Sequence, residues 1–162
     1  MLNVDDAVQG NPGRASAGGV IRGEDGEWVI GFSENLGHCY VVKAELRAFL
    51  RGLRIAREIS ISKLWIQSDS ITVLGMLNKP PNWNSEFGPL IHQCRQLIEW
   101  KGWDVKLSHC FREVNQVADK LAKLGLDLSL GVLIHRDPPV ETRGALYADK
   151  AGVFWPRVIK NK

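Results

Sequence analysis

The pattern of apolar residues at the start of the chain predicts three β-strands. Short segments with strand-like alternation cover residues 2–8, 16–22 and 27–34. Between the last two segments, Asp25-Gly26 supplies the positive-φ residues that a tight hairpin needs. We therefore expect these strands to form an antiparallel meander.

Apolar residues then recur every three to four positions, which predicts helices that alternate with strands. The first helix covers residues 43–59, where Leu46, Phe49 and Leu53 share one face. Glycine in a helix interior is less favourable than alanine by about 1 kcal/mol, so we expect Gly52 to permit close packing against the sheet. The remaining elements are a strand, a short helix, a helix, a strand and a helix over residues 63–68, 70–77, 89–101, 103–109 and 115–125.

This order of elements indicates an α/β fold. We expect a five-stranded mixed sheet, with three antiparallel and two parallel strands, flanked by helices. Ser70 and Asn115 are expected to cap the two helices that begin there. Tryptophans in strand, helix or tail contexts are expected to pack in the core, namely Trp28, Trp65, Trp100, Trp103 and Trp155.

The composition fits one compact domain: 162 residues are 44% hydrophobic and 24% charged. A net charge of +3 permits a polyanionic partner but does not by itself indicate one. The cysteines Cys39, Cys94 and Cys110 lack C-x-x-C spacing, which favours buried thiols in a reducing compartment. No signal peptide or long apolar run is recognised, so an intracellular protein without a membrane span is expected.

Acidic residues stand at positions that favour a metal site. Asp5 lies on the first strand, Asp69 directly follows the fourth, Glu45 is in the first turn of a helix, and Asp119 is inside the last helix. Hard oxygen ligands that converge at one sheet edge suit Mg²⁺, which also relieves their mutual repulsion. Asp6 should point to the opposite face of its strand, so we assign only Asp5 to this cluster.

Two further features lie close to these acids. The turn "GNPG" after the first strand offers exposed backbone donors. His109 ends the fifth strand, ten residues before Asp119, where an imidazole can carry protons near bound metal. An isolated histidine is more often a structural or surface residue, so both interpretations stay open.

Four segments together resemble the successive signature segments of the ribonuclease H family: "NVDDAVQGNPGRASAGGVIR", "KAELRAFLRGLRIA", "WIQSDSITVL" and "VKLSHCFREVNQVADKLAKLG". The resemblance is most specific to the plant-type ribonuclease H-like domain of non-LTR retrotransposon reverse transcriptases and the stand-alone proteins derived from them. It covers nearly the whole chain, including "HRDPP" and "ADKAGVFWPR" near the end. It implies a ribonuclease H-like domain over residues 1–125 and a C-terminal extension over residues 126–162 packed on the same domain.

The resemblance implies a metal-dependent endonuclease that hydrolyses the RNA strand of an RNA–DNA hybrid. Two Mg²⁺ ions would assist the reaction, and Mn²⁺ can substitute. The implied metal ligands are Asp5, Glu45, Asp69 and Asp119. His109 matches the family's proton-shuttling histidine. The positions that match the family's substrate contacts are Asn11, Gly13 and Ser70.

Two other residues are candidate substrate contacts. Lys43 can replace part of a phosphate contact, and Trp83 can rest on a sugar or base. A solvent-facing lysine and a packed tryptophan are the simpler alternatives. A basic series on the first helix, made of Arg47, Arg51 and Arg54, can likewise face phosphates or solvent.

The sequence departs from the family pattern at three places. Asp6 stands where the family usually has glycine, and "CYVV" replaces polar residues before Glu45. The segment 78–88 has only one lysine, where some members have a basic helix. These departures indicate reduced activity.

Three functions therefore remain open. The first is an active ribonuclease H, expected to be monomeric, with an RNA–DNA hybrid or double-stranded RNA as partner. The second is a domesticated domain that binds nucleic acid but cuts it slowly or not at all. The third is a protein-interaction module, which an exposed apolar patch on the C-terminal extension would favour. Integrases and junction-cutting nucleases share the architecture but match the fourth acid and His109 less well.

Overall fold

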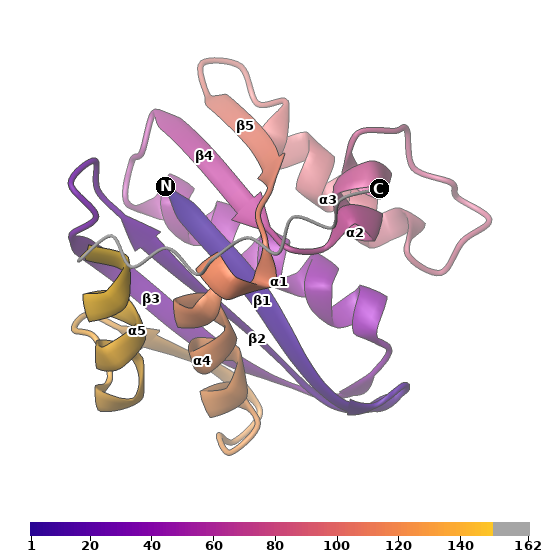
Figure 1. Ribbon diagram of the computed structural model, residues 1–162. Helices are drawn as coiled ribbons and strands as arrows, with labels where there is room; N and C mark the ends of the chain where they lie inside the picture. The colour runs from indigo at the N-terminus through magenta and orange to yellow at the C-terminus, as the bar shows by residue number, and fades with distance from the viewer. Residues whose placement is uncertain (151–162) are drawn as a thin grey trace, which may run out of the picture.

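The computed structural model describes residues 1–150 and folds them into a sheet with helices on both faces (Figure 1). The strands are β1 (Leu2–Gly10), β2 (Gly13–Arg22), β3 (Trp28–Cys39), β4 (Lys63–Ser68), β5 (Asp104–His109) and β6 (Gly131–His135). The helices are α1 (Val41–Glu58), α2 (Ile71–Leu77), α3 (Gly88–Ile98), α4 (Gln116–Gly125) and α5 (Val140–Lys150), with a 3₁₀ turn over Arg112–Val114.

The sheet is mixed, and its strand order is β5-β4-β1-β2-β3-β6. Strands β1, β2 and β3 form the expected antiparallel meander, and β4 and β5 add to it in parallel. The predicted ribonuclease H-like α/β fold is confirmed, but the sheet has six strands rather than five. The additional strand β6 pairs antiparallel with β3 through only four residue pairs at the edge of the sheet. Its side chains are largely exposed, so it has no buried face that alternation in the sequence could reveal.

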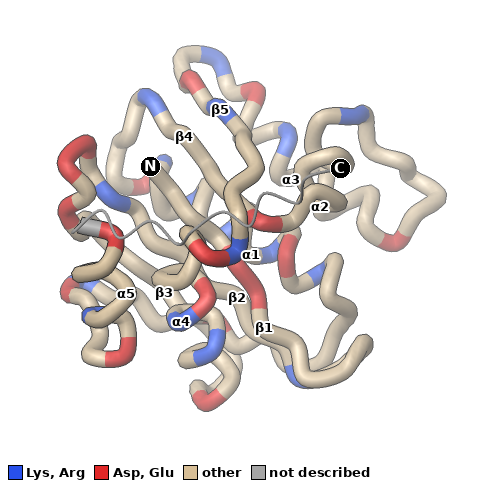
Figure 2. The backbone as a smooth tube through the Cα atoms, in the orientation of Figure 1, with Lys and Arg blue, Asp and Glu red and all other residues tan. Residues whose placement is uncertain are grey.

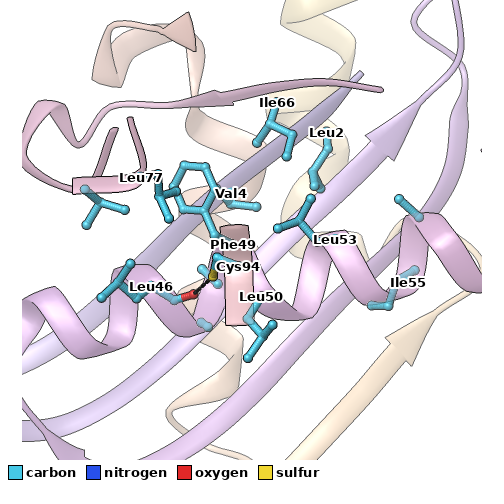
Figure 3. Close-up of a cluster of buried hydrophobic side chains, with 14 of the residues drawn as sticks. Leu2, Val4, Leu46, Phe49, Leu50, Leu53, Ile55, Ile66, Leu77 and Cys94 are labelled. Atoms are coloured by element: carbon cyan, nitrogen blue, oxygen red, sulfur yellow. Dashed lines mark hydrogen bonds between the residues drawn. The ribbon is translucent and has the colours of Figure 1, made fainter. Parts of the chain in front are cut away.

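Helix α1 packs against the centre of the sheet through the face that the sequence predicts. Phe49 and Leu53 of α1 are fully buried and lie among Leu2, Val4 and their neighbours (Figure 3). A Cβ at Gly52 would lie 2.6 Å from a methyl carbon of Leu2, so the expected close approach of this helix to the sheet is confirmed. Burial of this aromatic and aliphatic cluster holds β1 and α1 in a fixed relation.

The other face of the sheet is covered by α4, and α5 contacts α4 (Figure 1). Ala145 and Leu146 of α5 share a buried cluster with Val20, Val117 and Leu121. Within the described part of the chain, the residues beyond 125 thus add both a strand and a packed helix. The division of the chain at residue 125 into a ribonuclease H-like domain and a C-terminal extension stays a prediction. No helix in residues 1–150 is long and apolar enough to cross a membrane.

Several predicted boundaries are wrong. Strand β3 continues to Cys39, whereas the predicted strand ended at residue 34. Gly37 has a positive φ of 76°, and the pairing of β2 with β3 shifts register beside it, so a bulge interrupts the alternation that marks a strand. Helix α3 ends at Ile98 rather than at residue 101.

The expectation that the tryptophans pack in the core is only partly met. Trp28 and Trp103 are partly buried against the two largest clusters. Trp65 and Trp100, however, are 44% and 52% exposed. Each ring instead lies beneath a cation: Lys106 is 5.0 Å from the Trp65 ring centre, and Arg57 is 3.6 Å from that of Trp100. Trp155 lies outside the described residues.

All three cysteines are buried and free, as the sequence predicts. Burial raises the pKa of the Cys94 thiol to about 12, so this thiol stays protonated. The Cys94 Sγ points at the backbone carbonyl of Leu46 across the contact between α3 and α1 (Figure 3).

Candidate active site

An open cleft of about 880 Å³ is lined by six carboxylates from five segments of the chain. In Figure 2, red segments from different parts of the chain surround the central part of β1. Strand β1 contributes two acids, and α1, the residue after β4, the 3₁₀ turn and α4 contribute one each. These residues are Asp5, Asp6, Glu45, Asp69, Glu113 and Asp119.

Three of the carboxylates, those of Asp5, Asp6 and Glu45, resist ionisation because they are partly buried and have acidic neighbours. Burial raises the pKa of Asp5 to about 8, and repulsion from Asp69 adds to the rise. Burial also raises the pKa of Asp6 to about 7, with further repulsion from Glu45 and Asp69. The pKa of Glu45 is raised mainly by burial. Such a cluster has uncompensated negative charge that a divalent cation would neutralise.

The assignment of only one of the two adjacent aspartates, Asp5, to the metal-binding cluster stays a prediction, but the cleft itself contains both. Both line the cleft, and they face different neighbours: Asp5 is repelled by Asp69 and Asp119, whereas Asp6 is repelled by Glu45 and Asp69. Strand alternation does separate the two side chains. The cleft nevertheless receives both, because it is formed by α1 from one face of the sheet and α4 from the other.

Two cations that sequence reasoning did not single out pair with the acids. Arg112 Nε lies 3.2 Å from Asp69 Oδ2, and Lys123 Nζ lies 2.8 Å from Asp119 Oδ2. The lysine follows its acid by four residues on one helix, which is a signal that the sequence offers. The arginine is in an irregular turn and has no such signal. Both cations are largely exposed, so these pairs are weak and easily exchanged.

The donor set fits a hard divalent cation such as Mg²⁺ or Mn²⁺, because the acidic side chains of the cleft offer carboxylate oxygens. Within residues 1–150, however, no three His, Cys, Asp or Glu side chains are arranged closely enough to hold a metal ion. The carboxylates are held instead by ion pairs and a hydroxyl. Metal binding therefore requires Asp69 and Asp119 to exchange their cations for the ion.

Ser70 links the cleft to helix α2. Its hydroxyl donates to Glu45 Oε2 at 2.8 Å and accepts from the Val73 amide at 3.2 Å, which confirms the predicted helix cap. Asn115 occupies the predicted N-cap position of α4, but its side chain makes no cap hydrogen bond and instead donates to the Val4 carbonyl at 2.9 Å. At the start of α4, the side-chain amide of Asn115 therefore binds the backbone of β1 rather than the first turn of the helix.

The turn between β1 and β2 is fastened to the start of α1. Asn11 Oδ1 accepts a hydrogen bond from the Val41 amide at 3.1 Å. A Cβ at Gly13 would lie 1.8 Å from the Gln9 carbonyl oxygen, so only glycine fits in this turn. The two predicted contact residues of the "GNPG" segment therefore have clear structural roles.

The remaining candidate residues do not line the cleft. His109 is exposed at the end of β5, and its ring lies edge-on to Phe111 at 5.4 Å between centres. Lys43 lines a separate hollow of about 200 Å³ together with Arg47 and Glu86. Trp83 is 61% exposed, which contradicts its packing alternative, and lies beside His92.

The basic series on α1 forms neither a phosphate-facing row nor a fully solvated face. Arg51 donates to both oxygens of the buried Glu34, at 2.9 and 3.0 Å, and Arg47 lies 3.5 Å from the same carboxylate. The hydrogen bonds from Arg51 raise the pKa of its own guanidinium. Arg54 donates to Gln93 on α3. These arginines therefore serve mainly to attach α1 to β3 and α3.

The sequence model of a family described as reverse transcriptase-like matches residues 3–125. The chain belongs to the reverse transcriptase-like family. The match includes every carboxylate of the cleft. It ends before β6 and α5, so those two elements of this reverse transcriptase-like protein lie beyond the segment that the family shares.

A relative with a longer chain is the "Putative ribonuclease H protein At1g65750" of Arabidopsis thaliana. It is 35% identical over 159 residues, which is 98% of this reverse transcriptase-like chain. The chain spans about a quarter (26%) of that relative's length. The similarity therefore extends through the C-terminal extension, although the relative has much additional sequence.

Solved structures with the same fold include ribonucleases H1. The enzyme from the archaeon Halobacterium salinarum is 28% identical, with a TM-score of 0.71, and the match covers 78% of this chain and 96% of that one. The compost-derived LC11-RNase H1, solved in complex with an RNA/DNA hybrid, is 23% identical, with a TM-score of 0.65 over 78% of this chain and 95% of that one. The similarity of this reverse transcriptase-like protein to ribonucleases H thus covers both its sequence and its fold.

Proposed function

We propose that this reverse transcriptase-like protein is a metal-dependent endonuclease that hydrolyses the RNA strand of RNA–DNA hybrids. The observation that supports it is the convergence of mutually repelling carboxylates in one open cleft, where the pKa of Asp5 is raised to about 8. The likeness to ribonucleases H1, one of which was solved with an RNA/DNA hybrid, supports the substrate.

Four acids would hold the two Mg²⁺ ions, for which Mn²⁺ can substitute: Asp5, Glu45, Asp69 and Asp119. When bound, two such ions activate the attacking water and stabilise the departing 3′-oxygen. The protein's own part is to orient the ligands. Ser70 holds one oxygen of Glu45 by its hydroxyl hydrogen bond. Arg112 and Lys123 would leave Asp69 and Asp119 and become available to the phosphates of the substrate.

His109 would carry protons to and from the reacting phosphate. Its ring is exposed outside the cleft, and its backbone pairs with Ser68, the residue directly before Asp69. A rotation of the side chain from that position toward the cleft is consistent with a carrier that moves between solvent and the reaction. An exposed imidazole at this place also has free access to bulk water for proton exchange.

Five residues would contact the hybrid, namely Asn11, Gly13, Lys43, Ser70 and Trp83. Lys43 lines a hollow with Arg47 and Glu86, from which its ammonium group can approach a phosphate. The exposed ring of Trp83 has a free surface on which a sugar or base can rest. We further propose that the protein acts as an intracellular monomer and that double-stranded RNA can occupy the same surface.

Cleavage of an end-labelled RNA–DNA hybrid tests the proposal. We expect products with 5′-phosphate and 3′-hydroxyl ends only when Mg²⁺ or Mn²⁺ is present. Asp69→Asn is the matched control, because it preserves the side-chain shape and removes a ligand charge. The proposal fails if the wild-type protein leaves the hybrid intact with both metals.

A second function is favoured by the position of Asp6. Its carboxylate adds negative charge between Glu45 and Asp69, which opposes the approach of a polyanion. The protein would then bind a hybrid or double-stranded RNA without cutting it at an appreciable rate. Hybrid binding that needs no metal, combined with no cleavage, identifies this alternative.

A third function, protein interaction, is favoured by apolar residues on the C-terminal extension. Leu130 and Tyr147 are 77% and 75% exposed, and Leu133 and Ile134 of β6 are also exposed. Size-exclusion chromatography coupled to light scattering measures whether this surface associates with a second copy. A concentration-dependent dimer would contradict the proposed monomer.

A further inference from the structure

A buried set of polar side chains lies between the sheet and α4, with Asn3 of β1 at its centre. Asn3 is 1% exposed. Its Nδ2 donates to Asn115 Oδ1 at 3.2 Å and to Gln67 Oε1 at 3.4 Å, while its Oδ1 accepts from Arg22 Nη2 at 3.0 Å. A single amide therefore links β1 to the start of α4, to β4 and to β2.

Arg22 is a buried cation whose charge is balanced from helix α5. Its Nη1 donates to Asp149 Oδ2 at 2.6 Å. Within residues 1–150, its Nε has no hydrogen-bond partner, so Asn3 and Asp149 supply its only side-chain contacts of this kind. A buried charge that loses its partner is strongly unfavourable. Asp149 therefore determines whether Arg22 can stay in place beside Asn3.

Asn115 connects this set to two carboxylates of the cleft. Its Nδ2 donates to the carbonyl of Val4, the residue directly before Asp5. Its backbone carbonyl accepts from the Asp119 amide at 3.1 Å in the first turn of α4. A displacement of Asn115 would thus move Asp5 and Asp119 relative to each other.

Gln67 connects the same set to a third carboxylate. It lies on β4, two positions before Asp69, and accepts its hydrogen bond from Asn3. The fourth acid, Glu45, is held separately by Ser70. Three of the four proposed metal ligands therefore lie on elements that meet at Asn3.

We propose that Asp149 and Arg22 are positioning residues of the active site: through Asn3 they fix the spacing of the β1, β4 and α4 segments that bear the carboxylates. The C-terminal extension is then part of the framework that holds the metal ligands. The inference rests on the proposed function for its chemical consequence. Side chains that support metal ligands indirectly change metal affinity or activity by about 10–100-fold when they are replaced.

Asp149→Asn tests the inference, because it preserves the shape of the side chain and removes the charge that balances Arg22. We expect Mg²⁺ affinity, measured by calorimetry, to fall by roughly tenfold. The kcat for hybrid cleavage should fall with it at unchanged KM. Asp149→Glu restores the charge and should recover most of the affinity.

Thr142→Ala is the matched control on the same helix. Thr142 is fully buried, and its Oγ1 donates to the Pro139 carbonyl at 2.7 Å, away from Arg22. This variant should lower the Tm but leave Mg²⁺ affinity unchanged. Equal losses of affinity in Asp149→Asn and Thr142→Ala, or no loss in Asp149→Asn, would mean that α5 acts only by packing and would overturn the inference.

A readout on the metal-free protein separates this inference from the proposed function. In ¹H–¹⁵N spectra without metal, the amide signals of Asp5 and Asp119 should shift in Asp149→Asn and stay in place in Thr142→Ala. Unchanged signals in Asp149→Asn overturn the inference. If the wild-type protein neither binds Mg²⁺ nor cleaves a hybrid, the proposed function fails, but this spectral comparison still decides whether α5 is coupled to the carboxylates.

Discussion

Replacing Asp6 by asparagine removes one charge from the cleft and preserves the shape of the side chain. Burial, followed by repulsion from Glu45 and Asp69, raises the pKa of Asp6 to about 7. A carboxyl whose pKa rises from about 4 to about 7 opposes its own ionisation in the folded protein by at most roughly 4 kcal/mol. Because the Asp6 side chain is only partly buried, solvent screens part of this unfavourable interaction. We expect ionised Asp6 to destabilise the folded protein by about 1–2 kcal/mol.

The effect of Asp6→Asn on stability depends on pH with a definite sign. The folded protein holds the Asp6 proton more tightly than the unfolded chain does, so protonation of Asp6 stabilises the folded state. This stabilisation is complete below about pH 4 and is lost as the pH rises through about 7. The variant should therefore have a higher Tm at pH 8 in EDTA, by about 2–8 °C, and a Tm close to that of wild type at pH 4. Equal Tm values at pH 8 would refute this account of the cleft.

The same charge should limit hybrid cleavage. Two unit charges a few ångströms apart repel by about 1 kcal/mol in water and by up to about 4 kcal/mol in a partly screened protein site, which corresponds to roughly one to three decades of affinity or rate. We expect Asp6→Asn and Asp6→Gly to cleave faster than wild type at low salt. Added salt should narrow the difference, because it screens the repulsion. Equal rates at low salt would show that position 6 does not affect docking.

Four further variants test separate parts of the molecule. Asp69→Asn should weaken Mg²⁺ binding, measured by calorimetry, because it removes a ligand charge, and an unchanged affinity would contradict the proposed cluster. His109→Ala should lower kcat by about 10²–10⁴-fold with little change in KM or Tm, whereas an equal loss of hybrid affinity would make it a contact residue. Phe49→Ala should destabilise the fold by about 3–5 kcal/mol in urea unfolding, since Phe49 is fully buried, and a change below 1 kcal/mol would refute its place in the core. Trp83→Ala should leave stability nearly unchanged and weaken hybrid binding in a filter assay, and unchanged binding would remove Trp83 from the substrate surface.

The sequence predicts elements well wherever one face of an element is buried. Helix α1 shows its apolar face every three to four residues, and that face packs on the sheet as expected. The sequence did not predict strand β6, because both faces of this strand are largely exposed. The sequence did not predict the end of β3, because the bulge at Gly37 interrupts the alternation of apolar and polar residues along this strand. Trp65 was wrongly placed in the core because a strand residue can face solvent at the same spacing that places its neighbours inside.

The acidic residues of the candidate site could be predicted from the sequence, but the contacts that these residues make could not. The spacing of Asp5, Glu45, Asp69 and Asp119 along the elements indicated that they meet, and the cleft contains all four. Strand alternation predicts that Asp6 and Asp5 point to opposite faces of β1, but it gives no information on how far the cleft reaches around this strand. Contacts between distant residues, such as the pair of Arg112 with Asp69, depend on loop geometry that residue spacing does not encode.

The two adjacent aspartates of β1 also bind protons in the cleft near neutral pH. With pKa values of about 8 and about 7, Asp5 and Asp6 retain a large share of their protons in neutral solution. A cation that binds carboxylate oxygens must displace those protons, so metal and acid compete for the same atoms. Binding would acidify a weakly buffered solution and would strengthen as the pH rises from 6 to 8. The affinity of the cleft for a divalent cation would therefore depend on the pH of its surroundings.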